Sequence, residues 1–262
     1  EQLPEDARYF RVIAGDEEVS VASSRGSSPT NRGPRAGSPR GVVDRGDAGA
    51  RDVKRTIHGA TYHLNAESFF QTNIDLLPQL IDAALSDAEG NSAIELYSGV
   101  GLFTVPLARQ IGRTLAIEDD ADATRFARQN LANAGLKNTQ VVNADVGDWL
   151  DENLECAGND GALDGGAIRG SKAASPLRSA AALQNIDFLL LDPPRTGAES
   201  RVISGIIKMK PRRISYVSCD PATLARDLKK LIAGGYSIQS IHAFDMFPQT
   251  HHVETVVQLS VH

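Results

Sequence analysis

Apolar runs alternate with amphipathic segments over most of residues 74–261. Short runs that are almost continuously apolar predict strands at 93–97, 114–117, 140–143, 186–191 and 213–217. Segments with apolar residues at helical spacing predict helices at 74–85, 102–111, 122–134, 202–209 and 221–232. Strands that are apolar on both faces and alternate with helices indicate a mostly parallel sheet that is covered on both sides.

The last two strand-like runs, 238–244 and 253–261, have a mainly polar stretch between them and no helical pattern. We expect them to form a hairpin that places one antiparallel strand at the edge of the sheet. The predicted fold is α/β, with a mostly parallel seven-stranded sheet and a terminal antiparallel hairpin strand. This arrangement resembles the Rossmann-like fold of class I methyltransferases.

Two stretches interrupt the pattern. Residues 22–52 are dominated by Ser, Gly, Pro and Arg, and residues 156–183 are rich in Gly, Ala and Ser. Neither has enough apolar surface to offset the entropy lost on ordering. We expect the first to be a mobile linker or insertion, and the second to be a flexible surface excursion between two core elements.

Composition and charge limit the classes of protein to which this chain can belong. The net charge of −6 over 262 residues counts against a general nucleic-acid binder. Basic groups at 208–213 and 226–230 are interpreted as solvated helix faces more readily than as RNA contacts. No apolar stretch approaches the roughly 20 residues that a membrane span requires, and the acidic start shows no secretory signal. The two cysteines are too few for a disulfide scaffold or an all-cysteine metal site, which fits a reducing cytosol. We expect a cytoplasmic monomer without a metal.

A glycine-containing turn follows the first predicted strand, in Glu95-Leu-Tyr-Ser-Gly-Val-Gly101. Gly99 and Gly101 allow the backbone to turn sharply and approach a ligand, although a tight structural turn would use the same residues. Glu118 ends the next strand about 20 residues later, where an acid can accept hydrogen bonds from ribose hydroxyls. Together these features favour a site for a ligand that contains a nucleoside.

Two aspartates follow the next strands. Asp145 lies just after the strand 140–143, and it could contact an adenine amino group or serve equally well as the N-cap of a short helix. Asp192 begins Asp192-Pro-Pro-Arg195, in which two prolines fix an extended backbone. That rigid segment predicts a polar side chain held between a cofactor pocket and a substrate pocket.

Cys219 is the candidate nucleophile. It follows the strand 213–217 and precedes a helix with Pro221 near its first position, so the positive end of that helix should favour the thiolate. The polar neighbours Ser218 and Asp220 argue against a small apolar filler. A thiolate that adds to carbon 6 of a pyrimidine makes carbon 5 nucleophilic, and a separate base must later remove the carbon 5 proton. Cys156 lies in the excursion and is expected to be inert.

Glu254 is the candidate base, because it opens the last predicted strand on the same edge of the sheet as Cys219. A partly buried carboxyl there can have its pKa raised toward a useful range. His251 and His252 are the rival candidates, and hydrogen bonding within their loop is the ordinary alternative. No Cys or His partner stands at the spacing of metal ligands, so we expect no zinc site.

Five collinear motifs resemble those of the uracil-5 RNA methyltransferase family. They are Ser68-Phe-Phe-Gln71-Thr-Asn73, the turn 95–101, Asp192-Pro-Pro-Arg195, Ser218-Cys-Asp-Pro-Ala-Thr-Leu-Ala-Arg-Asp227, and Asp245-Met-Phe-Pro-Gln-Thr-His-His-Val-Glu254. The resemblance implies methyl transfer from S-adenosylmethionine to a uridine of tRNA or rRNA. By that similarity, the residues expected to line the cofactor pocket are Gln71, Tyr97, Gly99, Gly101, Glu118, Asp145 and Asp192. Cys219 would attack, Glu254 would take the proton, and Arg195, Ser218, His251 and His252 would contact the substrate.

The chain also departs from the family pattern. Asp220 stands where the family usually has Asn, and Leu102 stands where some members place an Asn that contacts the cofactor. The cysteine cluster that binds iron–sulfur in some members is absent. We expect residues 66–262 to be the catalytic domain, and residues 1–65 to be the remnant of an upstream linking and RNA-binding region.

Two alternative functions remain open. A cytosine-5 RNA methyltransferase would use the same thiolate chemistry, although the closing motif 248–254 favours uracil. A cofactor-binding RNA module without turnover is the second alternative. The presence of both Cys219 and Glu254 argues against that loss of activity.

Overall fold

The structure is a computed structural model of the 262-residue chain. It describes residues 10–14, 17–18, 52–65, 70–71, 73–155, 185–246, 248–250 and 252–261. The expected excursion 156–183, with Cys156, lies outside the described residues. So does the expected linker 22–52, apart from the backbone of Asp52.

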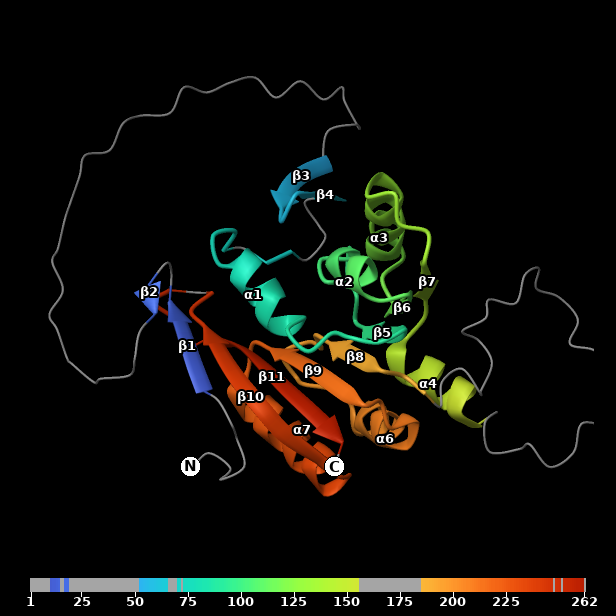
Figure 1. The fold of residues 1–262 in the computed structure, drawn as a ribbon, viewed down its shortest axis with the longest axis vertical. Coiled ribbons are helices and arrows are strands. Elements are labelled where there is room, and N and C mark those ends of the chain that lie inside the picture. The colour runs from blue at the N-terminus through green and yellow to red at the C-terminus, as the bar shows by residue number, and fades with distance from the viewer. Residues whose placement is uncertain are drawn as a thin grey trace, which may run out of the picture.

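The core of the fold is a mixed sheet in which five parallel strands run from the middle to one edge (Figure 1). Neighbouring parallel strands are β9 (Arg213–Ser218), β8 (Phe188–Leu191), β5 (Ser92–Leu96), β6 (Arg113–Glu118) and β7 (Thr139–Asn143), in that order. The C-terminal hairpin of β10 (Tyr236–Phe244) and β11 (Glu254–Val261) completes the seven predicted strands. The α/β class and the expected hairpin are therefore confirmed.

The position of the antiparallel strand differs from the expectation. β11 does not lie at the edge but between β9 and β10, and it is antiparallel to both. Its first six residues, from Glu254 to Leu259, are all buried. A strand that is buried on both faces suits an interior position better than an edge.

Two short strands extend the sheet from seven strands to nine. β1 (Phe10–Ala14) pairs in parallel with β10, and β2 (Glu17–Glu18) pairs antiparallel with β1. They belong to the segment 1–65 that we assigned to an upstream region, and their brevity gave no periodic signal. The division at residue 65 stays a prediction.

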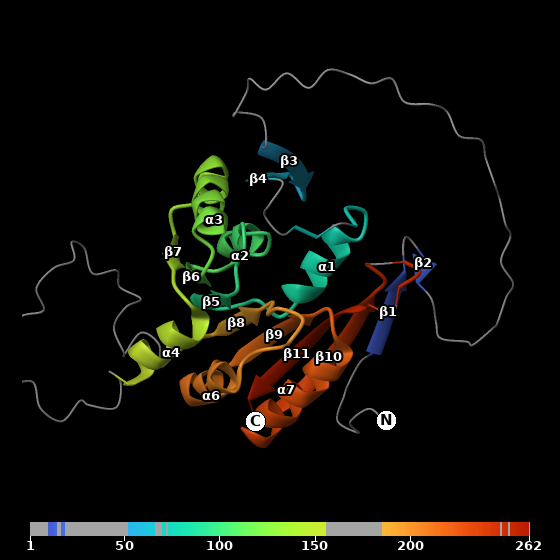
Figure 2. The same cartoon turned by 180° about the vertical axis from the view of Figure 1, so that it is seen from behind.

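Helices cover the two faces of the sheet with separate apolar cores (Figures 1 and 2). One face carries α1 (Leu77–Ala84), α2 (Thr104–Gln110) and α3 (Ala121–Asn133). The other carries α4 (Val146–Glu155), α6 (Ser200–Met209) and α7 (Pro221–Ala233). Successive side chains of β8 point to opposite faces of the sheet and pack into both cores. Phe188 and Leu190 belong to one core, and Leu189 and Leu191 belong to the other.

A hairpin of β3 (Asp52–Ile57) and β4 (Ala60–Asn65) packs on α3, and the sequence pattern did not predict it. The buried Asn130 amide exchanges hydrogen bonds with the backbone of His63 and donates to the Val100 carbonyl. The Tyr62 hydroxyl donates to the Leu102 carbonyl at 3.0 Å. These bonds fasten the hairpin to the glycine-containing turn after β5.

Among the described residues, none of the helices combines the length and the apolar character needed to cross a membrane.

Candidate active site

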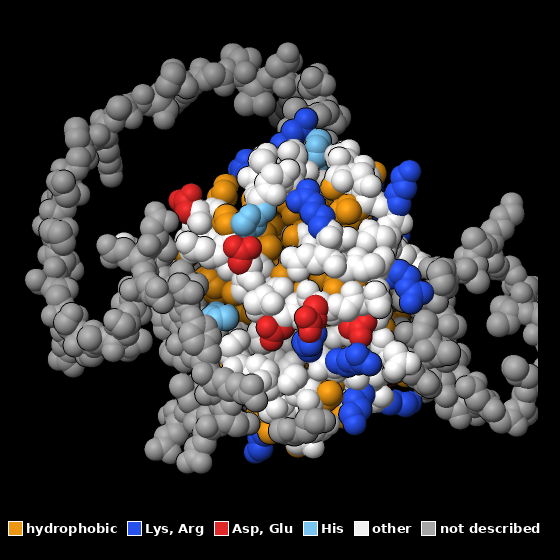
Figure 3. Space-filling model, in the orientation of Figure 1, with side chains coloured by type: hydrophobic (Ala, Val, Ile, Leu, Met, Phe, Trp, Pro, Cys, Tyr) orange, Lys and Arg blue, Asp and Glu red, His pale blue; other side chains and the backbone are white. Residues whose placement is uncertain are grey.

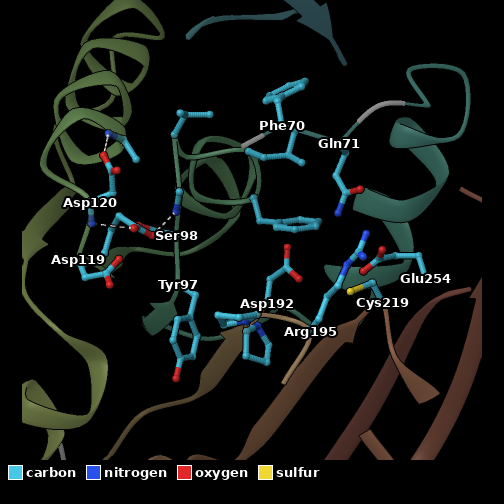
Figure 4. A pocket seen from close by; sticks show the side chains of 18 residues that line it. Phe70, Gln71, Tyr97, Ser98, Asp119, Asp120, Asp192, Arg195, Cys219 and Glu254 are labelled. Carbon is cyan, nitrogen blue, oxygen red and sulfur yellow. Dashed lines mark hydrogen bonds between the residues drawn. The ribbon is translucent and has the colours of Figure 1, made fainter. Parts of the chain in front are cut away.

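A cavity of about 570 Å³ opens at the carboxyl ends of the parallel strands. Ligand pockets of proteins have this size, and this edge of an open α/β sheet is where they form. Of the predicted site residues, the cavity wall includes Gln71, Tyr97, Gly99, Glu118, Asp192, Arg195, Cys219 and Glu254. Figure 4 shows Ser98, Asp119 and Asp120 at one end and Gln71, Arg195, Cys219 and Glu254 at the other. The structure thus brings most of the predicted residues into one place.

The turn after β5 is held in a conformation that favours glycine. Tyr97, Gly99 and Gly101 all have positive φ values, of 63°, 54° and 89°. A Cβ atom at Gly99 would meet nothing within 4 Å, so this residue is required for its backbone angle and not for space. Gly101 instead faces the Ala127 backbone of α3 and is not part of the cavity wall.

Glu118 is locked against this turn at the end of β6. One carboxylate oxygen accepts a hydrogen bond from the Gly99 amide at 2.8 Å, and the other accepts one from the Asp120 amide at 2.9 Å. Burial raises the pKa of Glu118 to about 7, against the effect of these backbone bonds. Each oxygen keeps a second lone pair, which a ribose hydroxyl can use.

Asp192 lies in the middle of the cavity, directly after β8 (Figure 4). Desolvation raises the pKa of its carboxyl well above the usual range, and the charges of Glu254 and Glu95 raise it further. Glu95 is itself only 1% exposed, and burial raises its pKa to about 8. Several carboxyl groups therefore lie within a small volume, where a negative charge on one raises the pKa of the others.

Cys219 follows β9 and is half-buried in the wall of the cavity. The expectation of a thiolate favoured by the helix is wrong, because the pKa of Cys219 is raised. Burial is the largest cause, Glu254 and Asp192 add to it, and Arg195 opposes it. The positive end of α7 is already neutralised, since Asp220 accepts bonds from the Ala222 and Thr223 amides at 2.8 and 2.9 Å.

Glu254 lies beside Cys219 because of strand register. β11 pairs with β9 with Thr255 opposite Ser218, so residue 254 follows next to residue 219. Glu254 is 1% exposed, and neither of its carboxylate oxygens has a hydrogen-bond partner among the described residues. Burial raises its pKa to about 7, while the nearby Gln71 amide and Arg195 guanidinium lower it.

Several predicted residues lie outside the cavity wall. Asp145 accepts a hydrogen bond from the Asp148 amide at 2.9 Å and pairs with Arg201, as an N-cap of α4 does. The Ser218 hydroxyl is used locally by the backbone of Asp220. The His252 amide donates to the Thr250 hydroxyl, and His251 lies outside the described residues. Contact of these side chains with a ligand stays a prediction.

The cavity also has walls that we did not predict. Phe70, Leu102 and Phe103 supply apolar surface, and Asp119 and Asp120 add carboxylates beside Glu118. Phe70 stands next to Gln71 in a quoted motif, which was the available signal. Leu102 was noted because it stands at a position where some family members place an Asn that contacts the cofactor. Phe103 carried no signal, because its spacing in the turn is the same as in a buried core.

The basic groups considered for RNA contact are partly engaged within the protein. Arg213 pairs with Glu89, Arg212 with Asp187, and Arg226 with Asp227. On the face in Figure 3, basic side chains lie beside acidic ones and form no continuous basic surface. No cluster of three or more potential metal-binding side chains occurs in the part of the chain that the structure describes.

The sheet order and the cavity at its carboxyl edge define a class I methyltransferase domain. A family model described as tRNA (uracil-5-)-methyltransferase matches residues 52–156 and 166–262. The chain belongs to this family.

Relatives and solved structures agree with the assignment. An uncharacterised RNA methyltransferase of Thermotoga maritima is 35% identical, over 76% of this chain and 39% of that protein. The 23S rRNA (uracil(1939)-C(5))-methyltransferase RlmD of Aeromonas hydrophila is 33% identical, over 77% of this chain and 40% of that protein. The chain thus spans about two fifths of the length of these relatives.

The crystal structure of the Pyrococcus abyssi tRNA (uracil-54, C5)-methyltransferase in complex with S-adenosyl-L-homocysteine is also similar. It superposes with a TM-score of 0.61 at 28% identity, over 80% of this chain and 45% of that chain. The catalytic fold is therefore shared with a protein that was crystallised with the demethylated form of the methyl donor.

Proposed function

We propose that this chain is the catalytic part of an enzyme that methylates carbon 5 of a uridine in tRNA or rRNA, with S-adenosylmethionine as the methyl donor. One observation carries the proposal. Cys219, directly after β9, and Glu254, at the start of β11, lie beside each other in the wall of the cavity that also contains the glycine turn and Glu118. The substrates named for the relatives, uracils of 23S rRNA and tRNA, support the choice of base.

The residues present fit S-adenosylmethionine. Glu118 has acceptor capacity for ribose hydroxyls next to the glycine turn, and Phe103 supplies an apolar wall. The Gln71 carbonyl oxygen and the Ser98 hydroxyl line the same space and have no hydrogen-bond partner among the described residues. Buried polar groups normally have partners, so these atoms indicate a polar ligand. When bound, the cofactor supplies an electrophilic methyl group on a sulfonium.

Cys219 and Glu254 divide the chemistry between them. The Cys219 sulfur adds to carbon 6 of uracil, which moves an electron pair into the ring and makes carbon 5 nucleophilic. After carbon 5 is methylated, the Glu254 carboxylate takes the carbon 5 proton. The double bond between carbons 5 and 6 then re-forms, and the sulfur leaves as a thiolate. A uridine stacked in RNA must be flipped out to reach both residues.

Arg195 is the positive group on this side of the cavity. Figure 4 shows it near Cys219 and Glu254, and its charge lowers the pKa of both groups. Because burial favours the neutral thiol, this guanidinium opposes the effect of burial and favours the reactive thiolate.

Incubation with cofactor and RNA that contains 5-fluorouracil tests the proposal. Fluorine cannot leave carbon 5 as a proton does, so the enzyme should be trapped on the RNA after methyl transfer. The Cys219→Ala variant should form no adduct, and Cys156→Ser is the matched control that should form it. RNA binding without an adduct would support the alternative of a binding module, and trapping only by 5-fluorocytosine RNA would support the cytosine-5 alternative.

A further inference from the structure

Helix α7 is fastened to the loop that carries Arg195. Residues 194–198 begin with the second of the two prolines after β8, and their backbone is hydrogen-bonded to side chains of α7. The Arg226 guanidinium donates to the carbonyls of Thr196 and Ala198 at 3.1 and 3.2 Å. The Asp227 carboxylate accepts from the Ala198 amide at 3.0 Å.

The acid in this network is completely buried. The Asp227 side chain is 0% exposed, and it also accepts bonds from the Tyr216 hydroxyl at 2.8 Å and from Arg226 at 2.8 Å. The loop approaches the side chains of Arg226 and Asp227 closely at Gly197. A Cβ atom at this position would lie 2.5 Å from Arg226 and 2.6 Å from Asp227. A buried carboxylate with all of these donors fixes geometry closely.

Thr223 links the same loop to the segment that carries Cys219. Its hydroxyl lies 3.2 Å from the carbonyl oxygen of Arg195 and 3.1 Å from that of Asp220, the residue after the nucleophile. The hydroxyl has one hydrogen and can donate to one of these carbonyls at a time. It therefore lies between the backbone of Arg195 and the backbone beside Cys219.

We propose that Thr223 and Arg226 are positioning residues, which hold the loop 194–198 on α7 and so keep the Arg195 guanidinium beside Cys219 and Glu254. The Arg195 side chain itself is exposed, and the contact that the backbone of Arg195 makes is with Thr223 of α7. The importance of the Arg195 position for methyl transfer rests on the proposed function, in which the sulfur of Cys219 attacks a uracil base. The position itself can be tested without RNA.

The test is the pH profile of Cys219 alkylation by iodoacetamide, a neutral reagent, in the Cys156→Ser background. Only the thiolate reacts, so the profile reports the pKa of Cys219. We expect Arg195→Gln to raise this pKa by about one unit, a roughly tenfold lower rate below the pKa. Thr223→Val, which has the same shape without the hydroxyl, should raise it by about half a unit, roughly threefold in rate. Thr223→Ser keeps the hydroxyl and should restore the original profile.

A double variant shows whether Thr223 acts through Arg195. If it does, Thr223→Val should have no further effect once Arg195→Gln is present, because effects transmitted by one group do not add. An equal shift in both backgrounds, or no shift in either, would overturn the proposal. Arg226→Lys is the second variant if Thr223→Val fails to fold, and it should raise the pKa only when Arg195 is present. Removing the whole Arg226 side chain is avoided, because it would leave buried Asp227 without its cation.

The two proposals fail in different ways. A wild-type protein that forms no fluorouracil adduct, but shows the alkylation pattern above, would contradict the catalytic assignment and support the positioning of Arg195. An adduct in the wild type with an unchanged profile in Thr223→Val would do the reverse.

Discussion

Two carboxylates in the same cavity are held in opposite ways. Glu118, on the side of the glycine turn, has both oxygens bonded to backbone amides at 2.8 and 2.9 Å. Glu254, on the side of the cysteine, has no hydrogen-bond partner on either oxygen among the described residues. Burial nevertheless raises the pKa of each to about 7.

The difference separates two tasks. A carboxylate fixed by the backbone presents its lone pairs in one direction, which suits recognition of a ligand that always has the same shape. Burial raises the pKa of Glu254 to about 7 although the Gln71 amide and Arg195 lower it. A carboxylate with that pKa is poised to gain a proton, which suits a base that acts once in each reaction. We infer that the cofactor side of the cavity is formed before binding, and that the substrate side is completed by the RNA base.

Replacing Glu254 should have the largest effect. Glu254→Gln keeps the shape but cannot take the carbon 5 proton, so we expect turnover to fall about 10²- to 10⁴-fold, as for other lost general bases. The covalent complex with RNA should accumulate, because the step that releases the enzyme is blocked. Gel electrophoresis of the protein with natural RNA and cofactor measures this. Unchanged turnover would remove Glu254 from the mechanism.

Replacing Glu118 should weaken the binding of the cofactor on the side of the glycine turn. In Glu118→Gln the amide can accept with only one oxygen, so the Gly99 or the Asp120 amide loses its acceptor. We expect the affinity for S-adenosylhomocysteine to fall roughly 10- to 100-fold, as titration calorimetry would show. Glu254→Gln is the matched control, and it should bind the same ligand with nearly the original affinity. Equal losses in the two variants would mean that the two sides are not separate.

The sequence predicted the fold well, because strands buried on both faces leave a clear apolar signal. It also placed Cys219 and Glu254 together, since both lie at the ends of strands at one edge of the sheet. The short strands β1 and β2 carried no such signal, and the place of β11 inside the sheet depends on pairing partners that the pattern does not specify.

The chemistry of individual side chains was harder to predict. Asp145 fitted an adenine contact and a helix cap equally well, and only the structure shows its bond to the Asp148 amide. The pKa of Cys219 depends on Asp192, Arg195 and Glu254, which are distant in sequence and meet only in the fold. The position of Cys219 before a helix therefore predicted the wrong direction for the shift of its pKa.

The stability of the protein should reveal the raised pKa of Glu254. The pKa of Glu254 is raised from 4.5 to about 7 in the folded chain, so the folded state binds this proton more tightly than the unfolded state does. The stabilisation is present below pH 4.5 and is lost as pH rises through 7. Glu254→Gln has no such loss, so its stability relative to the wild type should increase by about 1–3 kcal/mol between pH 5 and pH 8.

Urea unfolding at both pH values measures that difference. Glu152→Gln on α4 is the matched control, because this glutamate is exposed and its replacement should give the same pH dependence as the wild type. A difference between Glu254→Gln and the wild type that does not grow with pH would show that the carboxyl is not held neutral by burial.

The smallest expected effect concerns Asp220, the residue that follows Cys219. Its charge caps α7 beside Cys219, and hydrogen bonds from the Thr223 and Ala222 amides lower its pKa, so it is ionised at neutral pH. Asp220→Asn keeps an N-cap of similar quality but removes the negative charge. The exposed end of the helix dipole should then favour the thiolate, and the pKa of Cys219 should fall by roughly half a unit. Iodoacetamide alkylation below the pKa should become about threefold faster with little change in unfolding temperature. A slower reaction would mean that Asp220 supports the thiolate through its contacts and does not oppose it through its charge.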